Sequence, residues 1–332
     1  MSPKYCQYFN NGINFLTTGI SYCNKIWNDN AWEGSLLLPY SKNCIDRFIE
    51  QRSKLIEEMK NGNAPEYCKK CIYFKDIEDY SQIDDKINNI EIYHWYQCNC
   101  ACFYCSNRKY SKLKITRWKN INGKTKVLPK LKELKKRDLF ADKVNVTTVG
   151  GEPTILGEFK DLLNFFIENK FNVSILSNGI LYENLISKSI NANNDSYLTI
   201  SLDCGNRETF EKIKGVDKFN DVINNIKKYI EDTKENSYRV MVKYILLEGI
   251  NDNKEEINKW IDICTQIGVR NFFVTIEFCH SARSEKEISD NICKMYKYMK
   301  QRIKEVDENN IVSTYDFVEQ FIEKSSYKLV SY

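Results

Sequence analysis

The sequence lacks any apolar run long enough to span a bilayer, and its start, MSPKYCQYFNNG, lacks the apolar region of a signal peptide. These two absences predict a cytoplasmic protein that has no membrane partner. Apolar residues are not scarce, because hydrophobic residues make up 42% and aromatic residues 13% of the 332 residues, which argues against disorder. A chain of this length has room for one large domain and a small one.

The chain also lacks the overall basic excess of a general nucleic-acid binder, since its net charge is only +4. Residues 108–137 nevertheless contain thirteen Lys or Arg and a single acidic residue, Glu133. From Pro129 onward this basic stretch has the pattern of an amphipathic helix whose lysines face solvent. Its earlier part, residues 110–126, carries Trp118 among lysines and can alternatively guide an anionic substrate or a nucleic acid.

Cysteine, by contrast, is abundant. The chain has thirteen cysteines, and an odd count in tight groups indicates metal ligation rather than disulfides. Four of them lie in the segment CNCACFYC, residues 98–105, directly after an apolar run. Cys98, Cys102 and Cys105 have the spacing C-x3-C-x2-C. Three thiolates can hold three irons of a four-iron, four-sulfur cluster and leave the fourth iron open to another ligand.

This cysteine loop resembles the signature of the radical S-adenosylmethionine (radical SAM) superfamily, whose usual form Asn99 and Tyr104 also fit. The resemblance implies that SAM chelates the open iron through the amino and carboxylate groups of its methionine part. It implies further that reduction of the cluster cleaves SAM to methionine and a 5′-deoxyadenosyl radical, which abstracts hydrogen from a substrate. Cys100 departs from the usual pattern, and the C-x3-C-x2-C register leaves it outside the ligand set.

Downstream of this loop, apolar strand-like runs alternate with helical patterns. The predicted strands are 90–97, 143–149, 171–177, 197–203, 238–247 and 270–278. The predicted helices are 129–141, 157–169, 180–191, 219–234, 253–267 and 284–307. Such alternation indicates parallel β/α units with right-handed crossovers. Six units fit a partial (β/α)6 TIM-like barrel, which the resemblance also implies, and a doubly wound parallel sheet is the alternative on the pattern alone.

The second predicted strand is followed by the motif Gly150-Gly151-Glu152-Pro153. Adjacent glycines at a strand end let a ligand approach the backbone closely. The motif is similar to the GGEP motif of the superfamily, which implies that Gly150, Gly151 and Glu152 bind the amino group of SAM. A GGEP segment alone fits a plain turn equally well, but its position after this strand favours the binding site.

Small polar side chains end the third and fourth strands, at Ser177, Ser201 and Asp203. Such groups can hydrogen-bond a ribose and a carboxylate, and the resemblance implies that they bind these parts of SAM. Capping of the following helices is the alternative. The resemblance also implies that Tyr104 lies beside the adenine.

The first 85 residues carry five further cysteines, Cys6, Cys23, Cys44, Cys68 and Cys71. Residues 14–23 have the pattern of a hairpin and residues 45–60 that of a helix. Cys68 and Cys71 form a C-x2-C pair, which Cys6 and Cys23 can complete to four ligands. This arrangement resembles the twitch domain, a short relative of the SPASM domain, and so implies an auxiliary four-iron cluster. A zinc site is the alternative, as is Cys44 in place of Cys6.

The predicted architecture is therefore α/β, with a twitch-like, cysteine-rich α+β domain over residues 1–85, the partial barrel over 86–310, and a helix and tail over 311–332. The resemblance implies a reductant such as flavodoxin or ferredoxin. It favours a peptide or protein substrate, with a nucleic acid or a sugar as alternatives. Cys204 and Cys279 follow strand ends and are candidate hydrogen-atom donors. The rival interpretation is a non-catalytic iron–sulfur or zinc protein that binds nucleic acid through its basic stretch.

Overall fold

The computed structural model describes residues 4–23, 37–63, 66–69, 71, 74–77, 84–105, 125–277, 288–316, 318–320 and 322. The chain divides into two compact units. The first consists of Met1–Gln97, Lys114–Gly151 and Leu156–Ser174, and the second of Cys98–Leu113, Glu152–Ile155 and Ile175–Tyr332. The domain boundaries expected after residues 85 and 310 stay predictions.

The sheet of the first unit contains the N-terminal hairpin as well as the first two barrel strands. Its strands follow the order β7-β6-β2-β3-β4. Their bounds are β2 Gly12–Leu16, β3 Gly19–Ser21, β4 Leu37–Pro39, β6 Ile87–Tyr93 and β7 Phe140–Thr148. Strand β2 pairs antiparallel with β3, which confirms the predicted hairpin, and parallel with β6. The hairpin therefore extends the edge of the first barrel strand.

A second, two-stranded sheet lies in the same unit, formed by β1 (Lys4–Tyr5) and β5 (Lys75–Asp76). The helices of this unit are α1 Gln7–Asn10, α2 Cys44–Lys60, α3 Glu66–Lys69, α5 Leu128–Lys136 and α6 Phe159–Glu168. Helix α2 confirms the helix predicted over residues 45–60, and it packs Phe48 against Tyr22 with their ring centroids 5.0 Å apart.

Helix α5 ends earlier than its sequence pattern predicts, and β7 begins earlier. Asp138 has a φ of 54°, a left-handed conformation that aspartate tolerates and that cannot continue a right-handed helix. The N–H of Leu139 then bonds to the Leu134 carbonyl at 3.2 Å. Phe140 consequently belongs to the strand, where its ring packs edge-on against Phe171.

A buried carboxylate, Glu158, connects the start of α5 to the end of β6. It accepts hydrogen bonds from the backbone N–H groups of Val127 at 3.0 Å and Leu128 at 3.3 Å, and from His94 Nε2 at 2.8 Å. These N–H groups at the helix start have no intrahelical partner, so Glu158 satisfies donors that would otherwise be buried unbonded. Although burial by itself raises it, the bonds from His94 and Val127 lower the pKa of Glu158 below its usual range.

The sheet of the second unit is parallel. Its strands are β9 Tyr197–Ser201, β10 Val240–Leu246, β11 Asn271–Ile276 and β12 Ile311–Ser313, in the order β12-β11-β10-β9. Strand β8 (Asn172–Ser177) crosses from the first unit into the second. The helices are α7 Asn184–Ala192, α8 Arg207–Lys214, α9 Phe219–Thr233, α10 Lys254–Gln266 and α11 Asp290–Val306.

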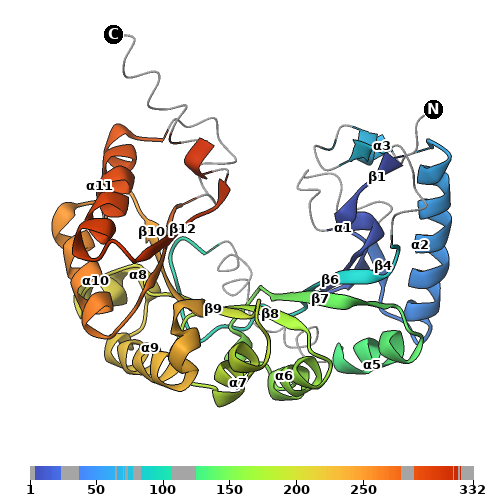
Figure 1. The fold of residues 1–332 in the computed structure, drawn as a ribbon, viewed down its shortest axis with the longest axis horizontal. Helices are drawn as coiled ribbons and strands as arrows, with labels where there is room; N and C mark the ends of the chain where they lie inside the picture. The colour runs from blue at the N-terminus through green and yellow to red at the C-terminus, as the bar shows by residue number, and fades with distance from the viewer. Residues whose placement is uncertain are drawn as a thin grey trace, which may run out of the picture. The chain divides into compact units, whose positions relative to one another are not determined.

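Helices α9, α10 and α11 cover one face of these strands (Figure 1). On β10, Tyr244 points toward this covered face and packs against Trp260 of α10, with ring centroids 5.0 Å apart. Since side chains alternate along a strand, the neighbouring positions Met241, Lys243 and Ile245 belong to the opposite face. These three side chains remain 7–9% exposed, whereas Val242 and Tyr244 are fully covered.

The α/β class is confirmed, with open, mostly parallel sheets consistent with a partial barrel. Each of the six predicted strands overlaps a strand of the structure. Several short elements were not predicted, among them the eight-residue helix α8 and the three-residue strand β12 of the second unit, because such short segments carry too few periods to stand out in a sequence. No helix in the described part of the chain is long and apolar enough to cross a membrane.

Replacing Glu158 by Gln tests the connection between α5 and β6. A carboxylate whose pKa is lowered by folding stabilises the protein above its unfolded pKa, and that contribution is lost as pH falls through the lower, folded pKa. We expect Glu158→Gln to lower the free energy of unfolding by about 1–3 kcal/mol at pH 7, and by less as the pH falls below about 4.5. Urea unfolding across this pH range measures both effects.

The matched control is Glu168→Gln, which changes an exposed carboxylate at the end of α6. It should leave the free energy of unfolding within about 0.5 kcal/mol of the wild type. Equal stability of Glu158→Gln and the wild type at pH 7 would contradict the proposed role of the carboxylate.

Candidate functional site

The cysteine loop, residues 98–105, is bonded to the C-terminal end of α8. The N–H of Ala101 donates to the Lys214 carbonyl at 2.7 Å, and the N–H of Phe103 donates to the Ile213 carbonyl at 3.2 Å. Gly215 ends the helix with a φ of 68°, and a Cβ at this position would meet Ala101 at 3.0 Å. A glycine is therefore required both by the left-handed conformation and by the close approach of the loop.

Beneath the loop lies a buried group of three side chains, Tyr104, Asp203 and Lys214. The Lys214 ammonium forms an ion pair with the Asp203 carboxylate, and the exposed fractions of the two side chains are 1% and 0%. Tyr104 donates its hydroxyl hydrogen to Asp203 at 2.7 Å and accepts from Lys214 Nζ at 3.0 Å. Tyr104 lies in the sequence between two of the predicted iron ligands, Cys102 and Cys105. Its bonds to the ion pair therefore anchor the loop by a side chain, in addition to the backbone hydrogen bonds of Ala101 and Phe103.

Asp203 has a φ of 64°, which is uncommon outside glycine. Hydrogen bonds from Ile245 N–H to its carboxylate at 2.9 Å and from Asn251 Nδ2 to its carbonyl at 2.8 Å fix this conformation. The strain is thus held by buried contacts at the end of β9, where a functional site is expected. The carboxylate predicted to contact SAM has no exposed surface of its own.

The thiols of the cysteine loop sit in an environment that favours thiolates at two of the three predicted ligands. A hydrogen bond from the Cys100 thiol lowers the pKa of Cys98, and it also lowers the pKa of Cys102 to about 6, with a further contribution from Lys214. The thiolate is the form that binds metals. Cys98 is exposed, while Cys102 and Cys105 are half-buried, so the donor set fits a cluster bound at the surface of this loop.

Glu152 of the GGEP motif is buried and has four hydrogen-bond donors around it. It accepts from the Asn178 N–H at 2.7 Å, the Ser177 hydroxyl at 2.8 Å, the Thr154 hydroxyl at 2.7 Å and the Thr154 N–H at 3.2 Å. Burial raises the pKa of Glu152, and these hydrogen bonds offset part of that rise. Glu152 thereby fixes the end of β8 and engages the predicted ligand Ser177.

Asn178 connects this strand end to the cysteine loop. Its Nδ2 donates to the Asn99 side-chain oxygen at 2.6 Å and approaches the Cys98 sulfur at 3.6 Å. Its Oδ1 accepts from the Ile180 N–H at 3.0 Å. Asn178 was not predicted as a site residue, although it directly follows the predicted ligand Ser177 at the end of the third strand.

The two glycines of the motif lie against the segment that follows β6. The N–H of Gly151 donates to the Trp95 carbonyl at 3.0 Å, and Gly150 has a φ of 119°. A Cβ at Gly150 would meet the Trp95 carbonyl oxygen at 2.6 Å, so only glycine fits. The predicted ligand Ser201 is half-buried at the end of β9.

Cys204 does not fit its predicted role as a hydrogen-atom donor. Its side chain is fully buried, and its thiol bonds to the carbonyl oxygens of Leu202 and Asn206 at 3.5 Å each. Burial raises the pKa of this thiol well above its usual range. Cys279, the other predicted donor, lies outside the described residues, as do residues 106–124 of the basic stretch.

The four N-terminal cysteines predicted to hold an auxiliary cluster interact electrostatically at Cys68. Burial raises the pKa of Cys68 to about 12, with additional contributions from Cys23, Cys6 and Cys71. The mutual repulsion of four thiolates would be relieved by a cationic metal centre, so this donor set fits one. No three His, Cys, Asp or Glu side chains in the described ranges form a group arranged for a single metal ion.

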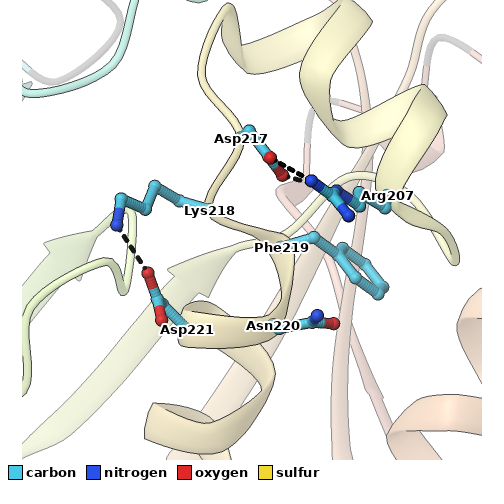
Figure 2. Close-up of a pocket in the computed structure, with 6 residues that line it drawn as sticks. All are labelled: Arg207, Asp217, Lys218, Phe219, Asn220 and Asp221. Atoms are coloured by element: carbon cyan, nitrogen blue, oxygen red, sulfur yellow. Dashed lines mark hydrogen bonds and ion pairs between the residues drawn. The ribbon is translucent and has the colours of Figure 1, made fainter.

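A small cavity of about 200 Å³ lies elsewhere in the second unit, where α8 and α9 begin (Figure 2). Arg207 pairs with Asp217 at 2.7 Å and Lys218 pairs with Asp221 at 2.9 Å across its walls. The charged groups of this cavity are therefore already neutralised. It contains none of the predicted site residues, and we assign it no function.

The sequence also matches a family model. The model of the radical SAM superfamily matches residues 92–261, slightly more than half of the chain. The chain belongs to the radical SAM superfamily. Its family implies a four-iron cluster and SAM, as the cysteine loop predicts.

Two relatives are informative about this radical SAM chain. It is 30% identical over 173 residues to a probable GTP 3′,8-cyclase of Saccharolobus islandicus. The match covers 52% of this chain and 51% of the relative. The chain thus spans about half the length of that protein. It is 22% identical over 267 residues to the S-adenosyl-L-methionine-dependent tRNA 4-demethylwyosine synthase of Methanocaldococcus jannaschii, covering 71% of this chain and 81% of that enzyme.

Solved structures of radical SAM proteins share the fold. The crystal structure of Streptococcus suis SuiB bound to precursor peptide SuiA superposes with a TM-score of 0.53. The match covers 92% of this chain and 60% of SuiB, with 17% sequence identity. At this identity the similarity supports the fold alone.

The buried ion pair under the cysteine loop can be tested by stability. Lys214→Met leaves the Asp203 carboxylate buried without its cation, which we expect to lower the free energy of unfolding by about 3–5 kcal/mol. Adding Asp203→Asn to Lys214→Met removes the unpaired charge. The free energy of unfolding of the double variant should therefore fall by less than the sum of the decreases in the two single variants. Anaerobic urea unfolding of the metal-free protein measures Lys214→Met, Asp203→Asn and the double variant.

Lys212→Met, which changes an exposed lysine of the same helix, is the control and should unfold at nearly the wild-type urea concentration. Strict additivity of the two single variants would show that the pair does not act as a unit.

Proposed function

We propose that this chain reductively cleaves SAM at a four-iron, four-sulfur cluster held by Cys98, Cys102 and Cys105, and uses the resulting 5′-deoxyadenosyl radical to abstract hydrogen from a substrate. The observation that carries the proposal is the cysteine loop itself. Its backbone and Tyr104 are anchored, and the pKa values of Cys98 and Cys102 are lowered toward the ligating form.

The chain's own contribution is to fix and surround this cofactor. The three thiolates would hold three irons, and the fourth iron would supply the site at which SAM is reduced. The N–H and carbonyl groups of Gly150 and Gly151 are the proposed contacts for the SAM amino group, because side chains are absent there. Ser201 remains the proposed hydroxyl contact on β9.

Three predicted SAM contacts are better described as positioning residues. The Asp203 carboxylate already pairs with Lys214 and accepts hydrogen bonds from Tyr104 and a backbone N–H. The Ser177 hydroxyl already donates to Glu152. We therefore propose that Asp203 acts through Tyr104 and that Glu152 acts through the end of β8. Tyr104 retains its proposed place beside the adenine through the backbone of the loop.

We further propose that Cys6, Cys23, Cys68 and Cys71 hold an auxiliary cluster in a twitch-like arrangement. The effect of Cys6, Cys23 and Cys71 on the pKa of Cys68 supports one common site. A zinc ion is the alternative occupant, since thiolates suit either metal. The electron donor proposed for the whole protein is a flavodoxin or ferredoxin.

A peptide or protein is the first proposed substrate, supported by the shared fold with SuiB, which was crystallised with its precursor peptide. A guanine nucleotide or a tRNA nucleoside is the second, supported by the names of the two sequence relatives. The rival function, a non-catalytic metalloprotein that binds nucleic acid, rests on the basic stretch alone.

Anaerobic reconstitution with iron and sulfide, followed by dithionite and SAM, tests the proposed activity. We expect 5′-deoxyadenosine from the wild type and from Cys100→Ala, because Cys100 is outside the ligand set. The triple Ala variant of Cys98, Cys102 and Cys105 should release less than about one hundredth as much, since the cluster would be absent. Stoichiometric zinc and no 5′-deoxyadenosine from the wild type would refute the proposal.

Iron counting tests the auxiliary cluster separately. After reconstitution, a Cys68→Ala, Cys71→Ala double variant should bind about four irons fewer than the wild type and keep the absorbance of one cluster. Cys44→Ala is the matched control, a buried cysteine of the same unit, and should keep the full count. An unchanged count in the double variant, with zinc absent from both proteins, would contradict a second cluster.

A further inference from the structure

Lys243 is a buried lysine in the middle of a parallel strand. It is the fourth of seven residues in β10, and only 7% of its surface is exposed. Tyr244, its neighbour in sequence, packs against Trp260 on the helix-covered face. Lys243 therefore belongs to the face opposite the one that α9, α10 and α11 cover.

The ammonium group of Lys243 has no hydrogen-bond or ion-pair partner among the described residues. The opposite charge that influences it most is Asp203, but that carboxylate already binds Lys214, Tyr104 and the N–H of Ile245. Burial of the unpaired ammonium lowers the pKa of Lys243. The residue is largely buried, but its ammonium nitrogen is not among the fully covered polar atoms that lack a partner, so it keeps some contact with solvent. A ligand that covers this nitrogen would have to pair with its charge, because a fully buried unpaired cation costs several kcal/mol.

The neighbours of Lys243 on its face are suited to a ligand. The register of the parallel strands places it beside Ser201 of β9 and Phe273 of β11. Phe273 is half-buried and packs edge-on against Tyr315, whereas the adjacent Phe272 is fully buried against Trp260. Lys243 also interacts electrostatically with Cys102 and Cys105 of the cysteine loop, and this interaction favours its charged form. A hydroxyl, an ammonium and an aromatic ring thus lie in a row near the predicted cluster ligands.

We propose that Lys243 binds an anionic oxygen group, a carboxylate or a phosphate, of the substrate. The inference rests on the proposed function, because it places the substrate on the face of β10 nearest the cysteine loop. Phe273 flanks the anion on one side and provides an apolar contact, and Ser201, the proposed SAM contact, lies on the other side. A neutral substrate would leave the ammonium buried and unpaired, so this face selects for negative charge.

The test uses the reconstituted wild type and the variants Lys243→Met, Lys243→Arg and Lys188→Met, the last an exposed lysine of α7. Calorimetric titration measures the affinity of each protein for SAM. It then measures, with SAM bound, the affinity for three probes, inorganic phosphate, acetate and guanosine 5′-triphosphate. Circular dichroism spectra and the iron content of every variant confirm that it is folded and loaded.

We expect Lys243→Met to bind at least one of these anions about ten- to one-hundredfold more weakly than the wild type, the effect of losing a charged hydrogen bond. SAM affinity should stay within about threefold of wild type, and Lys188→Met should match the wild type throughout. Lys243→Arg, which keeps the charge, should bind the anion more tightly than Lys243→Met.

Three results would overturn the inference. Equal anion affinity in Lys243→Met and the wild type, or no binding of any probe by a wild type that releases 5′-deoxyadenosine, would exclude a substrate anion at Lys243. A loss of SAM affinity alone would assign the lysine to SAM instead. A wild type that neither binds SAM nor releases 5′-deoxyadenosine would instead count against the proposed function.

Discussion

The ion pair between Lys214 and Asp203 is the interaction on which the second unit depends. It joins the C-terminal end of α8 to the end of β9, and through Tyr104 it holds the cysteine loop. Burying two charges is unfavourable unless other groups also bond to them, and Tyr104 bonds to both. Although burial alone would lower it, Asp203, Tyr104 and the Cys102 thiolate raise the pKa of Lys214 well above its usual range. The ammonium therefore stays charged beneath the loop.

The two groups of thiols have opposite electrostatic surroundings. In the cysteine loop, a hydrogen bond from Cys100 and the charge of Lys214 favour the thiolate of Cys102. At the N-terminal group, burial and the neighbouring thiols disfavour the thiolate of Cys68. If the second group binds a metal as proposed, binding must release more protons there, so its occupancy should depend more strongly on pH. Cys102 of the loop thus favours the ligating form without a metal, whereas Cys68 does not.

Spacing along the chain was enough to find the cysteine loop, the GGEP motif and the six barrel strands, because each is a local pattern. The partners of Asp203 could not be found in this way, since Lys214 resembles any lysine near the end of an exposed helix. A sequence signal did exist for Lys243, which interrupts the apolar run VMVKYILL. The role of Lys243 could not be inferred from this signal, because the packing of the whole sheet decides which face of a strand the helices cover.

The contact between the cysteine loop and Gly215 has a consequence for how the protein is made. Ala101 and Phe103 bond to residues more than one hundred positions later in the chain. During synthesis the cysteines leave the ribosome long before α8 exists, so the loop has no support in the nascent chain. Iron assembled on the loop at that stage would be held by the cysteines alone. If the loop holds the proposed cluster, its stable loading has to wait until the helix that ends at Lys214 has been translated and has packed beneath it.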